Sequence, residues 1–75
     1  MMILQDIPFG ANIQACRMKA GLTQEQLVAQ MQIRGSHISR STLARIETGS
    51  RNIKASDLIL IVNILKVDYK DIFES

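Results

Sequence analysis

The chain has few of the residues that build disulfides and metal sites. Its 75 residues include one cysteine, one histidine and one proline, and they include no tryptophan. A single cysteine cannot form an internal disulfide, and it is compatible with a reducing compartment. One cysteine and one histidine also fall short of the four ligands typical of a structural zinc site. We therefore expect no metal and no cofactor.

Long apolar runs are also missing. The segment "LILIV", bounded by Asp57 and Asn63, is far shorter than a membrane span. The first residues, "MMILQDIPFG", have neither the basic segment nor the long apolar segment of a secretory signal. These features predict a soluble, cytoplasmic protein that does not associate with membranes.

Catalytic signatures are absent as well. The sequence shows no set of nucleophile, base and orienting group, and no glycine-rich loop that would cradle a phosphate. Seventy-five residues suffice for a single modest core and can rarely spare residues for an enclosed pocket. We expect one non-enzymatic domain over residues 1–75, with a core from about 7 to 73, an N-terminal extension over 1–6 and no evident small-molecule ligand.

The positive charge is concentrated in one part of the chain. The net charge is only +2, but the window from Arg34 to Lys54 holds five cations and the single acid Glu47. A concentrated basic surface attracts polyanions, chiefly nucleic acid. On charge alone, a solvated surface loop explains this window equally well.

Apolar spacing and capping residues predict five helices. The second has a capping-box pattern, because Thr23 is followed three residues later by Gln26. The predicted starts and stops are the following: starts at Pro8, Thr23, Ser39, Ser56 and Asp68, and glycine stops for the first three helices at Gly21, Gly35 and Gly49.

The segment "DLILIVNIL" has an alternative reading as a β-strand, because it is rich in β-branched residues. A helix is favoured because four of its residues share one helical face and a lone strand would have no partner. These four are Leu58, Ile61, Val62 and Leu65. The predicted fold class is all-α.

The expected third helix has two contrasting faces. At helical spacing, the inward face carries Leu43, Ile46 and Glu47. The outward face carries Ser41, Ala44, Arg45 and Thr48. A narrow outer face of small, polar and cationic side chains fits a DNA major groove, where arginine can bridge O6 and N7 of guanine. A plain surface helix would explain the same pattern if it stood alone.

Glu47 lies on the inward face, where an unpaired carboxylate would be costly. Arg17 has the same difficulty on the first helix, where it shares a face with Ile13 and Cys16. We expect a charge-assisted structural ion pair between Arg17 and Glu47. In the alternative, both side chains lie at the edges of their faces and stay solvated.

Three segments together resemble a known family: "IQACRMKAGLTQEQLVAQM", "ISRSTLARIETGSRN" and "LIVNILKVDYKDIF". They look like the Cro/phage-repressor helix-turn-helix family, also called the XRE type, over about Ile7 to Phe73. The resemblance implies a compact five-helix, lambda-repressor-like domain that binds double-stranded DNA with its second and third helices. It also implies base contacts at Arg40, Ser41, Thr42, Ala44 and Arg45, and phosphate contacts at Gln24, Ser50, Arg51 and Lys54.

The chain departs from this family between the second and third helices. About five additional residues, roughly "IRGSH", lengthen the turn. We expect the second helix to continue to about Ile33, with Ile33 and Ile38 packed over the open end of the core. Arg34 would then add a phosphate contact, although a plain surface insertion fits equally well. The insertion leaves open the angle between the two helices.

The expected fourth helix carries additional apolar residues, Ile59, Leu60 and Ile64. The fifth helix or the "MMIL" segment could cover them, and so could a second copy of the chain. We favour a homodimer through the C-terminal helices. Two copies about 34 Å apart would read successive major grooves of a pseudo-palindromic operator.

The resemblance favours a sequence-specific DNA-binding transcriptional regulator, most simply a repressor. An antitoxin of a toxin–antitoxin pair would share the DNA-binding face and add a partner-binding surface. A protein-interaction module without DNA binding is the third reading. The outward Arg40 and Arg45 argue against that module, because a scaffold has no reason to keep cations on this face.

Overall fold

The structure is a computed structural model that describes residues 8–74. This part of the chain contains helices and no strands. The prediction of an all-α, five-helix fold is confirmed, and the strand reading of "DLILIVNIL" is wrong. The "MMIL" segment lies outside the described residues. The helices are α1 (Phe9–Lys19), α2 (Gln24–Ile33), α3 (Arg40–Glu47), α4 (Ala55–Leu65) and α5 (Tyr69–Phe73).

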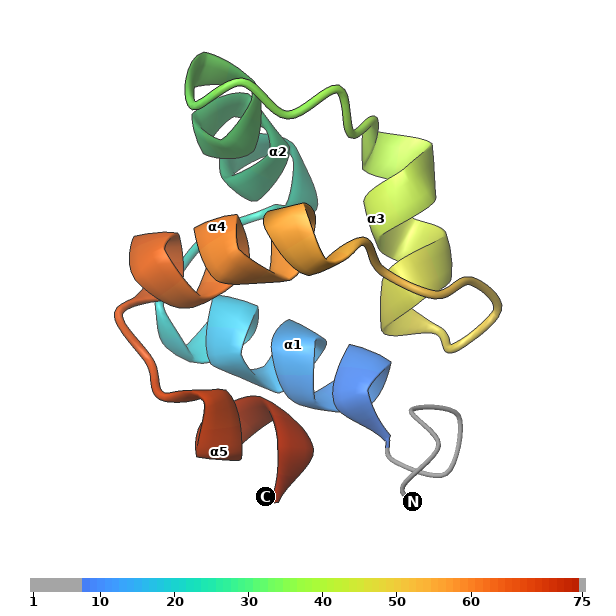
Figure 1. Ribbon diagram of the computed structural model, residues 1–75, viewed down its shortest axis with the longest axis vertical. Helices are drawn as coiled ribbons and strands as arrows, with labels where there is room; N and C mark the ends of the chain where they lie inside the picture. Colours follow the sequence, from blue (N-terminus) through green and yellow to red (C-terminus); the bar gives the residue numbers. More distant parts are fainter. Residues whose placement is uncertain (1–7, 75) are drawn as a thin grey trace.

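The helices pack so that α3 stands at one side of the molecule (Figure 1). α1 packs against α5 and α3, while α2 packs against α4 and α3. In the view of Figure 1, α2 and α5 lie at opposite ends and α3 stands beside the N-terminal ends of α1 and α4. One side of α3 is thus turned away from the other helices.

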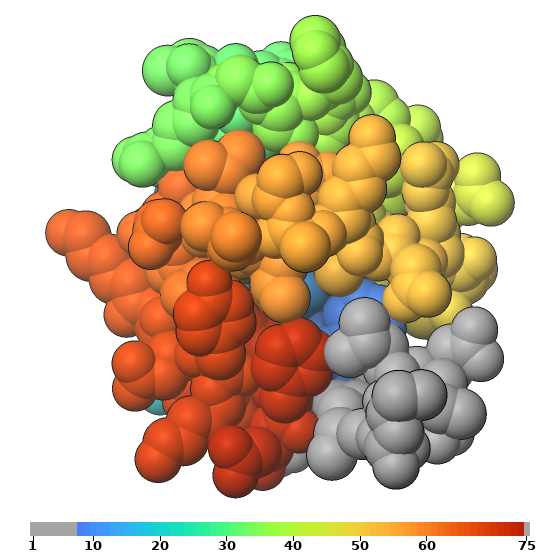
Figure 2. All heavy atoms as spheres, in the orientation of Figure 1, coloured from blue at the N-terminus to red at the C-terminus, as the bar shows by residue number. Residues whose placement is uncertain are grey.

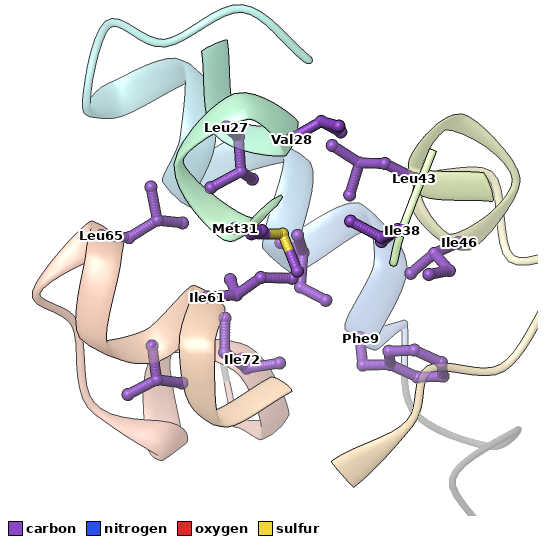
Figure 3. Packing of buried hydrophobic residues seen from close by; sticks show 12 residues of the cluster. Phe9, Leu27, Val28, Met31, Ile38, Leu43, Ile46, Ile61, Leu65 and Ile72 are labelled. Carbon is purple, nitrogen blue, oxygen red and sulfur yellow. The ribbon is translucent and has the colours of Figure 1, made fainter. Parts of the chain in front are cut away.

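A single apolar core joins all five helices (Figure 3). The sequence predicts its members from helical spacing, including the stripe on α2 formed by Leu27, Val28 and Met31. Ile38, from the loop before α3, is also buried in this core. The other members are Phe9, Ile13, Leu43, Ile46, Ile61, Val62, Leu65 and Ile72.

The predicted caps of α2 and α3 are present. The Thr23 hydroxyl accepts the Gln26 N–H at 3.0 Å, and the Gln26 side-chain oxygen accepts the Thr23 N–H at 2.9 Å. Ser39 Oγ accepts the Thr42 N–H at 3.2 Å. Both helices therefore begin where the sequence places them.

The predicted cap of α4 is wrong. The helix begins at Ala55 with Lys54 as its N-cap, and Lys54 makes no side-chain capping bond. The Lys54 carbonyl already accepts the Leu58 N–H at 3.0 Å, so Ser56 lies inside the first turn. The apolar period of the segment does not define this boundary, because both starting points give the same buried face.

Gly10 allows α1 to approach α3 closely. A Cβ atom at this position would overlap the carbonyl oxygen of Ile46. Gly10 is buried within the first turn of α1, so its lack of a side chain serves a close helix–helix contact. This contact fixes α1 against the C-terminal half of α3.

Three hydrogen bonds that involve side chains hold the lengthened turn. Ser36 Oγ donates to Asp57 Oδ1 at 2.7 Å and accepts the Ile38 N–H at 3.0 Å. Gln32 Nε2 donates to the Ile38 carbonyl at 2.8 Å. Gly35, with φ of +102°, supplies the left-handed residue where the chain reverses after α2.

One expectation for this region is wrong. Ile33 ends α2 as predicted, but its side chain is 85% exposed and does not cover the core. Ile33 follows Met31 by two positions, which places it on the opposite face of the helix from the buried stripe. Of these two residues, only Ile38 is buried in the core.

Candidate nucleic-acid interface

α3 presents one buried and one exposed face. Leu43, Ile46 and Glu47 are buried, while Ser41, Arg45 and Thr48 are exposed. The two intermediate positions, Thr42 and Ala44, are half-buried. The division of faces matches the helical spacing of the sequence, and it leaves Arg45 near the middle of the outer face.

The N-terminal end of α3 is shaped by hydroxyl groups. Ser39 Oγ lies 3.1 Å from Ser41 Oγ and 3.0 Å from Thr42 Oγ1, in addition to its capping bond. Arg40, the first residue of the helix, is exposed, and its Nε lies 3.5 Å from Glu25 Oε1 on α2. The predicted base-contacting residues of this turn therefore lie together at one end of the helix.

A buried ion pair ties α3 to α1. Arg17 Nε and Nη2 donate to the two Glu47 carboxylate oxygens at 2.7 and 3.0 Å. Arg17 Nη1 also donates to the Leu22 carbonyl at 2.8 Å. The side chains are 9% and 0% exposed, so the solvated alternative is wrong and the predicted pair is structural.

Gln24 joins this network from the first position of α2. Its Nε2 donates to Glu47 Oε1 at 3.0 Å, which leaves the second N–H of the amide for another acceptor. The first backbone N–H groups of a helix have no partner within it and favour anions. Gln24 is thus both a support for Glu47 and a candidate phosphate contact.

The C-terminal end of α3 is capped by two hydroxyl groups. Thr48 Oγ1 and Ser50 Oγ each donate to the Arg45 carbonyl at 3.1 Å, and the Ser50 N–H donates to the same oxygen at 3.0 Å. A phosphate oxygen accepts but does not donate hydrogen bonds. A phosphate contact at Ser50 would therefore require one of these bonds to break.

The remaining phosphate candidates are exposed cations. Arg34 lies in the lengthened turn, and Arg51 and Lys54 lie in the loop between α3 and α4. The face drawn in Figure 2 shows the turn in green directly above the start of α4 in orange. A hollow of about 190 Å³ between them is lined by His37, Arg51, Lys54 and Asp57, among others.

The three predicted dimer residues are not equally exposed. Ile59 is 47% exposed, whereas Leu60 and Ile64 are half-buried and pack against the core. The apolar patch on α4 is therefore smaller than the sequence indicates. The two half-buried residues flank the buried stripe of α4 and share its contacts.

Metal-binding clusters and membrane-spanning helices are not found in residues 8–74. This range contains no group of three or more histidine, cysteine or acidic residues that could hold a metal ion. None of its helices has the length and apolar character needed to cross a membrane. Burial, and secondarily the charge of Asp71, raises the pKa of the Cys16 thiol on α1.

Together, the cap, the buried support and the exposed cationic face define a helix-turn-helix domain built on α2 and α3. The family described as "Helix-turn-helix domain" matches residues 8–71, and the chain belongs to this family of XRE-like domains. The predicted resemblance is confirmed. No curated protein and no solved structure matches the chain.

Sequence reasoning missed two residues beside this interface. Glu25 lies next to Arg40, and Ser36 anchors the turn to α4. The first contact joins the helices on either side of the lengthened turn and the second begins within it, and the path of this turn cannot be read from residue spacing. An acidic residue in the first turn is common at helix starts, so Glu25 carries no separate signal for a partner on α3.

Proposed function

We propose that this protein is a sequence-specific transcriptional regulator that binds double-stranded DNA by placing α3 in the major groove. The observation that carries the proposal is the outer face of α3, where Ser41, Arg45 and Thr48 are exposed on a helix whose opposite face is buried. Bound at a promoter, a domain of this size would act most simply as a repressor that occludes it.

Arg45 is the central base-reading residue in this proposal. It is exposed, and within residues 8–74 it forms no ion pair that would have to break on binding. Arg40 and Ser41 in the first turn would read neighbouring bases. Thr42 and Ala44, both half-buried, would make contacts at the edge of the face, such as with a thymine methyl group.

Phosphate contacts on both sides of α3 would set its register on the duplex. Gln24 would donate from the start of α2, and Arg51 and Lys54 would act from the loop after α3. Arg34 would extend this set through the lengthened turn. Ser50 would join only by giving up its bond to the Arg45 carbonyl.

We further propose a homodimer that binds a pseudo-palindromic operator. One helix of eight residues reads few base pairs, whereas two copies about 34 Å apart read two major grooves. The contact would centre on Ile59 of α4, with Leu60 and Ile64 contributing the parts that remain accessible.

Salt-dependent binding tests the proposal. A labelled duplex from upstream of the protein's own gene is titrated beside a scrambled duplex, with wild type, Arg45→Ala and Lys70→Ala. Lys70 is an exposed cation on α5, so its variant controls for loss of charge alone. We expect preference for the upstream duplex, a loss of about 1–3 kcal/mol in Arg45→Ala, and little change in Lys70→Ala.

The other outcomes are informative. Equal, weak binding of both duplexes would contradict specificity for this site, and selection from a randomised library would then decide whether another operator exists. A complete absence of binding at low salt would contradict the regulator proposal. The protein-interaction module would then be favoured.

A further inference from the structure

The first turns of α2 and α3 are joined by an ion pair at the surface. Arg40 Nε lies 3.5 Å from Glu25 Oε1, and the two side chains are 65% and 74% exposed. The Arg17–Glu47 pair, in contrast, is buried. The surface pair is therefore accessible to a ligand at the N-terminal end of α3.

The position of Arg40 on its helix explains this contact. Arg40 is seven residues before Glu47, so the two project from nearly the same side of α3, about 20° apart. Gln24 holds the first turn of α2 against that side through its bond to Glu47. Glu25, the next residue, is consequently kept within reach of the Arg40 guanidinium.

The closest approach of the pair is between Arg40 Nε and Glu25 Oε1, on the inner side of the guanidinium. The two terminal nitrogens form the outer end of the group. These two nitrogens together match O6 and N7 of a guanine. The Glu25 carboxylate also repels a phosphate group, which disfavours engagement of Arg40 with the DNA backbone alone.

We infer that Glu25 is a positioning residue that directs the terminal nitrogens of Arg40 toward a guanine and so sharpens selectivity at one base pair. The inference deepens the proposed function and rests on it. A surface ion pair changes an equilibrium by at most about fivefold. The effect of Glu25 is therefore a modest gain in discrimination at a single position.

The test measures discrimination rather than affinity. The wild type first selects a duplex from a randomised library. Affinities are then measured for this duplex and for each of its single base-pair replacements. The proteins compared are wild type, Arg40→Ala, Arg45→Ala, Glu25→Gln and Glu74→Gln. The two alanine variants identify the base pairs that depend on each arginine. Glu74, an exposed acid after α5, controls for the removal of one negative charge.

We expect Glu25→Gln to reduce discrimination about two- to fivefold at the Arg40-dependent base pair and to leave the Arg45-dependent one unchanged. Glu74→Gln should change neither, and thermal unfolding should show all variants folded. Unchanged discrimination in Glu25→Gln would overturn the inference. So would an equal loss at every position, or an Arg40→Ala variant that loses discrimination nowhere.

Failure of the proposed function would look different. A wild-type protein that selects no duplex from the library would overturn DNA recognition itself, and this inference with it. A wild type that selects a duplex, with Glu25→Gln behaving like wild type, would retain the regulator and remove only the role of Glu25.

Discussion

The two ends of α3 are attached to the rest of the molecule in different ways. Its C-terminal half is fixed to α1 by the buried Arg17–Glu47 pair and by the close approach at Gly10. Its N-terminal end follows the lengthened turn over residues 34–39, which is mostly exposed and is joined to α2 and α4 by side-chain hydrogen bonds of Gln32 and Ser36.

This difference indicates where additional residues would be tolerated. Buried, bidentate and close-packed contacts fix the direction of a helix, because any displacement leaves a charge unpaired or atoms overlapping. An exposed turn can gain residues at little energetic cost, since loop-closure entropy grows slowly with length. The α1–α3 attachment therefore sets the orientation of α3, and the turn adjusts to it.

The largest expected effect is at Glu47. Replacing it with alanine leaves the buried Arg17 guanidinium unpaired, which should lower the free energy of unfolding by about 3–5 kcal/mol in chemical denaturation. The double variant Arg17→Met with Glu47→Leu should recover much of that loss, because it removes both charges. A Glu47→Ala variant as stable as wild type would contradict the claim that the α1–α3 attachment sets the orientation of α3.

Gly10→Ala should have the next largest effect. The new methyl group would overlap the Ile46 carbonyl and force the two helices apart, at about 1–3 kcal/mol. Where space is available, alanine stabilises a helix relative to glycine, so the sign of the change in the free energy of unfolding distinguishes the two cases. Ala11→Gly, at the exposed neighbouring position, measures the contribution of helix propensity without the steric overlap. A Gly10→Ala variant more stable than wild type would exclude a close approach.

Ser36→Ala should have a smaller effect. It removes the bond to Asp57 Oδ1 and the bond from the Ile38 N–H, for an expected loss of about 1–2 kcal/mol in thermal or chemical unfolding. Ser56→Ala, an exposed serine at the start of α4, is the matched control and should be nearly neutral. A loss as large as that of Glu47→Ala would show that the turn, too, sets the orientation of α3.

Arg34→Ala should have the smallest effect on stability, within about 0.5 kcal/mol, because the side chain is exposed. If the turn faces the duplex, the slope of log affinity against log salt should fall by about one for a lost phosphate contact. Lys70→Ala should leave that slope unchanged. An unchanged slope in Arg34→Ala would mark the insertion as plain surface.

The sequence allowed the helices, most of the core and the Arg17–Glu47 pair to be predicted. Apolar period and capping residues act locally, so they place α2 and α3 without tertiary information. The ion pair followed from two charges on otherwise apolar faces. Together with the family resemblance, these features predicted the helix-turn-helix arrangement of α2 and α3.

Features that depend on tertiary distances could not be predicted. Ile33 is a different case, because its position two residues after Met31 already places it on the outer side of α2, and its exposure follows from helical spacing. The contact between Glu25 and Arg40 depends on how closely α2 approaches α3. The partial burial of Leu60 and Ile64 depends on how α4 sits on the core, which spacing alone does not determine.

The most direct test of the account is the mapping of backbone amide chemical shifts during titration with the duplex selected from the library. We predict the largest changes in α3, in the first turn of α2 around Gln24 and over residues 50–54, with α5 nearly unaffected. Changes concentrated on α4 and α5, with α3 unperturbed, would contradict the claim that the exposed face of α3 reads DNA.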